Sequence, residues 1–222
     1  MKKLFVALGM AFILTAGAFY ASSAEVEFPL LKDGDLIFQT STSSQSNAIL
    51  VATGSAFTHM GIIKRNPGGF VVVEASSTVK ETPLRNWVNR GLLNRAAVYR
   101  DANLTHGQAI VILATAEKLY GQPYDIFFSF GNGAIYCSEL PYLAYAEAGI
   151  SIGKVQKISE LNFDNMVVKK MIEQRWQRHA ACKAKNYNFE QCFNHLLNQD
   201  LVTPASIAGD KRFELVFSNY PF

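Results

Sequence analysis

Residues 58–75 read THMGIIKRNPGGFVVVEA and contain two apolar runs on either side of a turn sequence. The runs, near 58–64 and 69–75, are rich in β-branched residues, which favour strands. Between them, the letters NPGG at 66–69 combine residue types that form tight turns. The stretch therefore predicts a β-hairpin, and with it an antiparallel sheet.

Further elements are predicted on both sides of this hairpin. Short apolar runs predict strands near 34–39, 95–100 and 212–217. Capping residues and apolar periodicity predict helices at 43–53, 106–120, 137–148, 163–181 and 188–199, and a short helix that begins at Thr203-Pro204. Because the strands come mostly first and the helices later, we expect an α+β domain in which an antiparallel sheet packs against helices.

The N-terminus has the layout of a secretory signal peptide. Two lysines precede an uncharged apolar run at 4–20, and the small residues ASSA follow it. The run is short for a membrane span, and no basic cluster follows it. Residues 1–24 are therefore predicted to be removed on export, which leaves 25–222 as one periplasmic or secreted domain. The alternative is an uncleaved membrane anchor.

The charge balance gives no indication of a nucleic-acid partner. The chain carries 21 basic and 18 acidic side chains, and two of the lysines belong to the predicted signal peptide, which leaves 19 basic ones. These are scattered, whereas a nucleic-acid-binding surface needs Lys and Arg gathered on one face. The partner we expect is a small-molecule, peptide or acylated substrate, with no stable membrane insertion after signal cleavage.

The sequence has three cysteines, Cys137, Cys182 and Cys192. Cysteines tend to pair in an oxidising compartment, and an odd one is left over. A disulfide between Cys182 and Cys192 would clip two helical segments together. They are otherwise small buried thiols, or metal ligands beside His179 and His195, although the spacing matches no common zinc pattern. If the pair is closed, Cys137 is the unpaired thiol.

Cys137 lies where a glycine-containing loop leads into a predicted helix. A helix N-terminus favours the thiolate form of a cysteine, and its free N–H groups can hold an oxyanion. The alternative is an inert buried thiol. His59 opens a predicted strand, and Glu74 interrupts the apolar run VVVEA on the partner strand, where a buried carboxylate needs a partner. The hairpin is expected to bring Glu74 beside His59, so these residues form a candidate Cys–His–Glu triad.

At these residues the sequence resembles the circularly permuted branch of the NlpC-type papain-like cysteine hydrolases, the YiiX/YebB-like family. In the unpermuted branch the cysteine-bearing helix comes first. Here its counterpart comes last, and the motifs follow in the order GDLIF (34–38), HMGII (59–63), YGQPYD (120–125) and YCSEL (136–140). The resemblance extends from about residue 31 to VTPASI at 202–207 and is weakest across 160–200.

The resemblance implies a permuted papain-like fold and assigns roles to four residues. Cys137 corresponds to the nucleophile, His59 to the general base, and Glu74 to the group that orients the histidine. Tyr124 corresponds to the tyrosine that such enzymes place beside the cysteine, and it is otherwise a core residue of an aromatic-rich loop. Nothing in the resemblance requires a cofactor.

The sequence therefore predicts an exported cysteine hydrolase that cleaves amide bonds, peptide or N-acyl, through an acyl-enzyme intermediate. Its expected substrates are cell-wall peptides or acylated amino acids and lipids. The apolar loop YDIFFSF at 124–130 either forms an acyl pocket or belongs to the core. Two alternatives are open: a lipid acyltransferase or thioesterase, and a non-catalytic wall- or ligand-binding module on the same fold. A binding module would have no need for all three triad residues.

Overall fold

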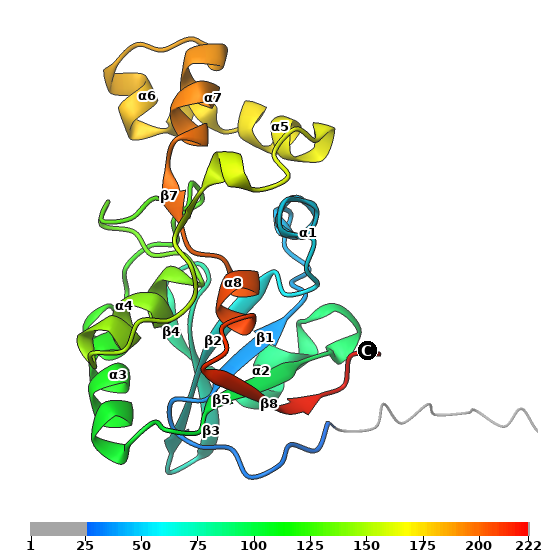
Figure 1. The fold of residues 1–222 in the computed structure, drawn as a ribbon, viewed down its shortest axis with the longest axis vertical. Helices are drawn as coiled ribbons and strands as arrows, with labels where there is room; N and C mark the ends of the chain where they lie inside the picture. The colour runs from blue at the N-terminus through cyan, green and yellow to red at the C-terminus, as the bar shows by residue number, and fades with distance from the viewer. Residues whose placement is uncertain (1–25, 222) are drawn as a thin grey trace, which may run out of the picture.

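The computed structural model describes residues 26–221, so the predicted signal peptide lies outside the described residues. Six strands form one antiparallel sheet in the order β4-β3-β2-β1-β5-β8 (Figure 1). They are β1 (Leu36–Gln39), β2 (His59–Asn66), β3 (Gly69–Ala75), β4 (Val79–Pro83), β5 (Ala97–Asp101) and β8 (Phe213–Ser218). A separate two-stranded ribbon pairs β6 (Gln156–Lys157) with β7 (Asp200–Leu201).

The helices follow the predicted pattern with two differences. They are α1 (Ser46–Thr53), α2 (Leu84–Asn89), α3 (His106–Lys118), α4 (Glu139–Glu147), α5 (Met166–Glu173), α6 (Ala180–Ala184), α7 (Phe189–Leu197) and α8 (Pro204–Ala208). The α+β class is confirmed. The single helix expected at 163–181 is wrong, because α5 ends at Glu173 and His179 caps a new helix, α6. Strand β4 and helix α2 were not predicted.

The β2–β3 hairpin has the register that its turn sequence predicts. Asn66 pairs with Gly69, and Ile62 pairs with Val73. Gly61 is required at its position, since a Cβ there would lie only 2.7 Å from the carbonyl oxygen of Val73. Extending the register places Glu74 opposite Gly61, on the same face of the sheet as the side chain two residues before Gly61. That residue is His59.

Both faces of the sheet are covered. Phe38 and Ile62 belong to the main core, which includes buried residues of α3 and α4. Ile63 and Val72 point to the other face, where they pack with Trp87 of α2. This alternation along neighbouring strands follows from the two-residue period of a strand. The centre of the sheet is therefore a rigid base for residues at the strand ends.

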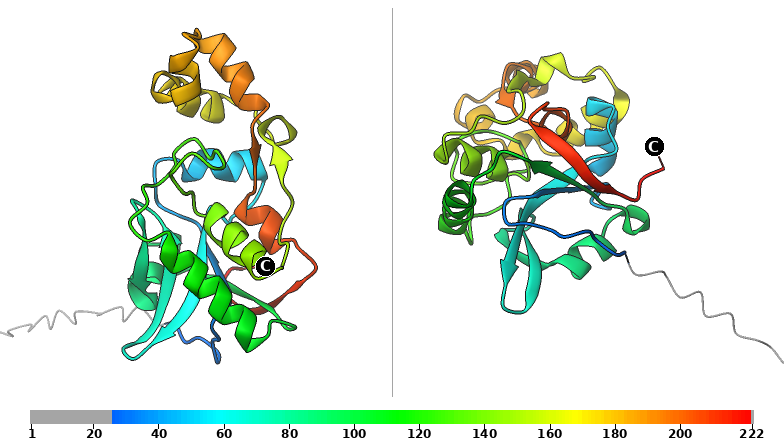
Figure 2. Two further views of the ribbon diagram at one scale, coloured as in Figure 1. Left: turned by 90° about the vertical axis from the view of Figure 1, so that its left-hand side faces the viewer. Right: turned by 60° about the horizontal axis from the view of Figure 1, so that its bottom comes forward.

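Helices α5, α6 and α7 gather at one end of the molecule, away from the sheet, and we call residues 163–199 the helical cap (Figures 1 and 2). The cap has its own hydrophobic cluster, in which Val168 and Ile172 of α5 pack against Ala48 of α1 and the two cap cysteines. None of the helices between residues 26 and 221 combines the length and apolar character needed to cross a bilayer.

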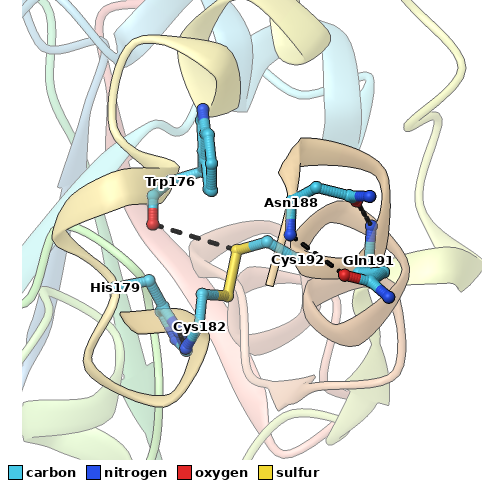
Figure 3. The surroundings of a disulfide bond; sticks show 6 residues. All are labelled: Trp176, His179, Cys182, Asn188, Gln191 and Cys192. Carbon is cyan, nitrogen blue, oxygen red and sulfur yellow. Dashed lines mark hydrogen bonds between the residues drawn. A yellow bond between two sulfur atoms is a disulfide. The ribbon is translucent and has the colours of Figure 1, made fainter. Parts of the chain in front are cut away.

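Cys182 of α6 and Cys192 of α7 are joined in the cap, with Cα atoms 5.4 Å apart, and Cys137 is free (Figure 3). In the chain-entropy description, closing a loop this short contributes about 2–3 kcal/mol to the free energy of unfolding. We expect one free thiol when the unfolded, unreduced protein is titrated with a thiol reagent. A count of three would contradict the pairing.

Candidate active site

Cys137 lies just outside the N-terminus of α4, two residues before the first helical residue, Glu139, and is 2% exposed. The helix was expected to begin at Cys137 itself. Ser138 anchors this junction by donating a hydrogen bond from Oγ to the carbonyl oxygen of Val202, 2.9 Å away. The positive end of the α4 dipole therefore lies close to Cys137, where it favours negative charge.

His59 and Glu74 meet across the hairpin, as its register requires. The distance from His59 Nε2 to Glu74 Oε2 is 2.6 Å, and the two residues are 8% and 0% exposed. Because Nε2 faces the carboxylate, Nδ1 is the ring nitrogen left for the thiol of Cys137. Burial alone lowers the pKa of His59, but hydrogen bonds to Cys137 and Glu74 outweigh it and raise the pKa to about 9.

Three further donors surround the Glu74 carboxylate. Oε1 accepts from Thr82 Oγ1 at 2.6 Å, and Oε2 accepts from Trp87 Nε1 at 3.1 Å and from the guanidinium of Arg90. Burial opposes the charged form of Glu74, yet the bonds from His59 and Arg90 lower its pKa to about 2. The carboxylate is therefore ionised and fixed, and it holds the imidazole in one orientation.

Sequence reasoning missed all three of these donors. Thr82 lies on β4 and Trp87 on α2, neither of which was predicted, and Arg90 follows directly after α2. The apolar periodicity of this segment is weak, since β4 reads VKETP and α2 has six residues. The only usable signal in the sequence was the expected burial of the Glu74 carboxylate. A buried carboxylate needs hydrogen-bond donors, but the sequence does not show which residues provide them.

Tyr124 lies beside Cys137. It forms a parallel bridge with Ile135, so the loop that starts at the tyrosine returns to it just before the cysteine. Burial and the hydrogen-bonded thiol of Cys137 raise the pKa of Tyr124 well above its usual value. The phenol therefore stays protonated and can donate a hydrogen bond near the sulfur.

Asp125 organises the loop between Tyr124 and Cys137. Its carboxylate accepts from the N–H groups of Phe127 and Ser129, at 2.8 and 2.6 Å, and from Asn132 Nδ2 at 2.9 Å. These hydrogen bonds fix the backbone of a loop that belongs to no helix or strand. The aromatic side chains that follow Asp125 consequently become part of a cavity wall.

Two cavities of opposite character flank the thiol–imidazole pair. One has a volume of about 70 Å³ and an almost wholly apolar lining, contributed by Cys137, the 126–128 loop, α1 and the helical cap. The other, of about 290 Å³, is lined by polar side chains that include Ser41, Gln45 and the two partners of Cys137, His59 and Tyr124. The reacting groups therefore lie at the border between an apolar and a polar compartment.

The ion pair predicts how stability depends on pH. The pKa of Glu74 is about 2 instead of 4.5, so its contribution is complete above pH 4.5 and is lost as the pH falls toward 2. The pKa of His59 is about 9 instead of 6.5, so its contribution is complete below pH 6.5 and is lost as the pH rises through 9. The pair therefore stabilises the fold most between pH 4.5 and 6.5.

We expect Glu74→Gln to lower the free energy of unfolding in that window by about 3 kcal/mol, because it removes one member of a buried ion pair. It should also flatten the decline of stability below pH 4.5. Urea unfolding from pH 3 to pH 9 measures both effects, and Glu214→Gln, at an exposed position on β8, is the matched control. Equal losses in the two variants would contradict the assignment.

Comparisons with known proteins find relatives over most of the chain. Residues 30–217 match the sequence profile of the permuted papain-like amidase enzymes of the YaeF/YiiX, C92 family. Over 191 residues, the chain is 36% identical to the uncharacterized protein YiiX of Escherichia coli K12. The aligned region spans 85% of this chain and 87% of YiiX. It also resembles the crystal structure of metalloprotein YiiX from Escherichia coli O157:H7, with a TM-score of 0.75 and 31% identity over 86% of this chain and 98% of that one.

Proposed function

The chain belongs to the family of permuted papain-like amidases, and from that premise we propose that it is an exported cysteine hydrolase of amphiphilic N-acyl amides. The observation that carries this proposal is that Cys137 lines the apolar cavity while its partner His59 lines the polar one. An amide bond placed at Cys137 would have its acyl chain on one side and its polar amine portion on the other. The apolar cavity is small, about 70 Å³, which favours a slim aliphatic chain over a bulky ring system.

In the proposed reaction, the sulfur of Cys137 attacks the amide carbon, and the carbonyl oxygen becomes an oxyanion. A backbone N–H at the start of α4 and the hydroxyl of Tyr124 are the candidate donors to this charge. As the C–N bond breaks, protonated His59 gives its proton to the leaving amine. Water then attacks the thioester and gives a proton to His59, and the C–S bond breaks to release the acid.

One charged group marks the boundary between the two cavities. Arg175 lines the apolar cavity, and its Nη1 donates to Oε1 of Gln45, which lines the polar one, at 2.8 Å. No ion pair involves Arg175 within the described residues. A carboxylate on the substrate would provide the counter-charge, so an N-acyl amino acid fits this arrangement better than an uncharged amide.

The test is a side-by-side measurement of amine release from N-acyl amino acids of increasing chain length and from peptidoglycan fragments. The Cys137→Ser protein is the blank. We expect turnover of the acylated amino acids, and Arg175→Gln should raise KM for these substrates without a comparable change for their carboxamide analogues. Lys170→Gln, which removes a positive charge from an exposed position on α5, should change neither. Turnover of peptidoglycan fragments alone would reject the acyl substrate, and acyl transfer to an alcohol in preference to water would make the protein an acyltransferase.

The donors at the triad do not fit a catalytic metal ion. Nε2 of His59 is bonded to Glu74, and the carboxylate of Glu74 already accepts from Thr82, Trp87 and Arg90. Among residues 26–221, the three-donor cluster that the geometry does provide lies in the helical cap and not at the triad. The word metalloprotein, applied to the related YiiX structure, therefore adds no step to the reaction proposed here.

Export is the remaining part of the proposal, and it rests on the sequence of residues 1–24. We expect the mature protein to begin near Glu25. Intact-mass measurement of the protein recovered from the periplasm or medium determines the first residue. Retention of residues 1–24 would instead indicate a membrane anchor.

A further inference from the structure

A cluster of metal-donor side chains lies outside the triad, around the disulfide of the helical cap (Figure 3). His179, Cys182 and Cys192 are all buried, and one donor atom from each lies within 4.8 Å of the other two. His195 is not one of these three donors, but its ring centroid lies 5.7 Å from that of His179, so a change of its side-chain rotamer would bring a second imidazole to the cluster. Two sulfurs and two imidazoles form one of the common ligand sets of structural zinc sites.

The two halves of the cluster have the same spacing along the chain. His179 caps α6 and precedes Cys182 by three residues, and Cys192 precedes His195 by three residues on α7. Side chains three residues apart lie on one face of a helix, so each helix offers one sulfur and one nitrogen to the other. Common zinc patterns instead pair two cysteines on one segment, which is why the spacing alone did not indicate a site.

The backbone separation suits either form of cross-link. The Cα atoms of Cys182 and Cys192 are 5.4 Å apart, and their sulfurs are bonded. In a tetrahedral zinc site with Zn–S bonds of about 2.3 Å, two sulfurs lie about 3.8 Å apart. Rotation of the cysteine side chains provides most of that separation, so α6 and α7 need not move far. The disulfide form, in contrast, has no thiolate to offer a metal ion.

We propose that this cluster is a redox-dependent site for a divalent metal ion that prefers sulfur and nitrogen ligands, of which zinc is the example. A two-electron reductant, a dithiol or a phosphine, breaks the S–S bond and leaves two thiols, while the dithiol becomes a disulfide or the phosphine, with one water, becomes its oxide. The metal ion then replaces the two thiol protons, which are released. Disulfide and metal are thus alternative cross-links between the same helices.

This exchange bears on the apolar cavity. Ile172 and Leu196 line that cavity and also belong to the hydrophobic cluster that contains both cap cysteines. A metal ion bound after reduction would keep α6 and α7 together, and with α7 the part of the cavity wall that Leu196 provides. Under oxidising conditions the disulfide does so without a metal.

The test uses Co²⁺ as a spectroscopic probe in the Cys137→Ser background, which leaves the two cap cysteines as the only thiols. A phosphine reductant is chosen because dithiols bind metal ions themselves. We expect the reduced protein to bind one equivalent of Co²⁺ with a thiolate-to-metal charge-transfer band that excess Zn²⁺ removes, and the oxidised protein to show no such band. His179→Ala and His195→Ala should each weaken binding about tenfold or more. His106→Ala, at an exposed position on α3, is the matched control.

Circular dichroism of the reduced protein with and without Zn²⁺ gives a second measurement, in which helix content and thermal midpoint should rise on metal binding. Reduced protein that binds no Co²⁺ overturns the proposal, whether or not its cap remains folded. So does an equal charge-transfer band in a variant that also carries Cys182→Ser and Cys192→Ser. Binding that is unchanged in both histidine variants would equally reject the four-donor site.

Discussion

Replacing Cys137 by alanine is expected to lower kcat/KM for any amide that the enzyme hydrolyses by about 10⁴-fold or more, the scale of losses when a catalytic nucleophile is removed. Without the sulfur, neither the tetrahedral intermediate nor the acyl-enzyme can form on the protein. The fold should persist, because the side chain is small and Ser138 still anchors the start of α4 through Val202. The measurement is amine release under steady-state conditions, with circular dichroism as a check of folding.

Intact-mass analysis of the same reaction separates the chemical role of Cys137 from a structural one. When the wild-type reaction is quenched early, a fraction of the protein should carry the mass of the acyl group, and peptide mapping should place that group on Cys137. Neither the alanine variant nor a serine variant should accumulate it. Activity above a tenth of the wild-type value in the alanine variant would show that another group is the nucleophile.

Much of this site follows from local sequence, because one turn fixes its geometry. The NPGG sequence pairs Asn66 with Gly69, and from that pair the register runs back along both strands. Glu74 must then lie on the same face as His59, close enough for the 2.6 Å contact. A glycine at position 61 leaves room for the approach. Two members of the candidate triad could thus be brought together without knowledge of the rest of the fold.

The groups that complete the site could not be predicted in the same way. Thr82, Trp87 and Arg90 reach Glu74 from segments with little periodicity, and their contacts exist only once the sheet and α2 have packed. Arg175 comes to the apolar cavity from the helical cap, far from the triad in sequence. Such contacts depend on tertiary packing, which a pattern of apolar residues does not specify.

The helical cap shows the same limit in its secondary structure. Residues 166–184 contain neither proline nor glycine, so the sequence favours one continuous helix. The chain instead breaks after Glu173, and the side chain of His179 accepts the N–H of Cys182 to start α6. The cross-link between Cys182 and Cys192 and the packing on α1 outweigh the local preference for a continuous helix.

Replacing His59 by alanine is expected to change the pH dependence of Cys137 alkylation, because the two side chains form a hydrogen-bonded pair. The pKa of His59 is about 9, so the ring is positively charged at neutral and mildly acidic pH and stabilises negative charge on the neighbouring sulfur. An ordinary thiol, with a pKa of about 8.5, is less than about 1% ionised at pH 6. In the wild type, iodoacetamide should therefore modify Cys137 much faster at pH 6 than it modifies an ordinary thiol.

His59→Ala removes both the counter-charge and the proton carrier. Alkylation at pH 6 should then fall by about 100-fold, toward the rate of an ordinary thiol, and turnover should fall by about 10³-fold or more. Glu74→Gln keeps a hydrogen-bond acceptor for the ring but loses the negative charge, so the pKa of His59 should fall and both rates should decrease less. The experiment follows the modification of Cys137 against pH in wild type, His59→Ala and Glu74→Gln, with His106→Ala as the control histidine.

Comparing alkylation rates in the three proteins separates a coupled imidazole–thiol pair from two independent side chains. If the pair exists, the rate of Cys137 alkylation at pH 6 should be highest in the wild type, lower in Glu74→Gln and lowest in His59→Ala. The control variant His106→Ala should match the wild type. Reactivity in the wild type that rises only near pH 8.5, and does not move in His59→Ala, would mean that the imidazole and the thiol are not coupled. Cys137 would then be a buried structural cysteine, and the polar and apolar cavities on either side of it would form a binding site without a nucleophile.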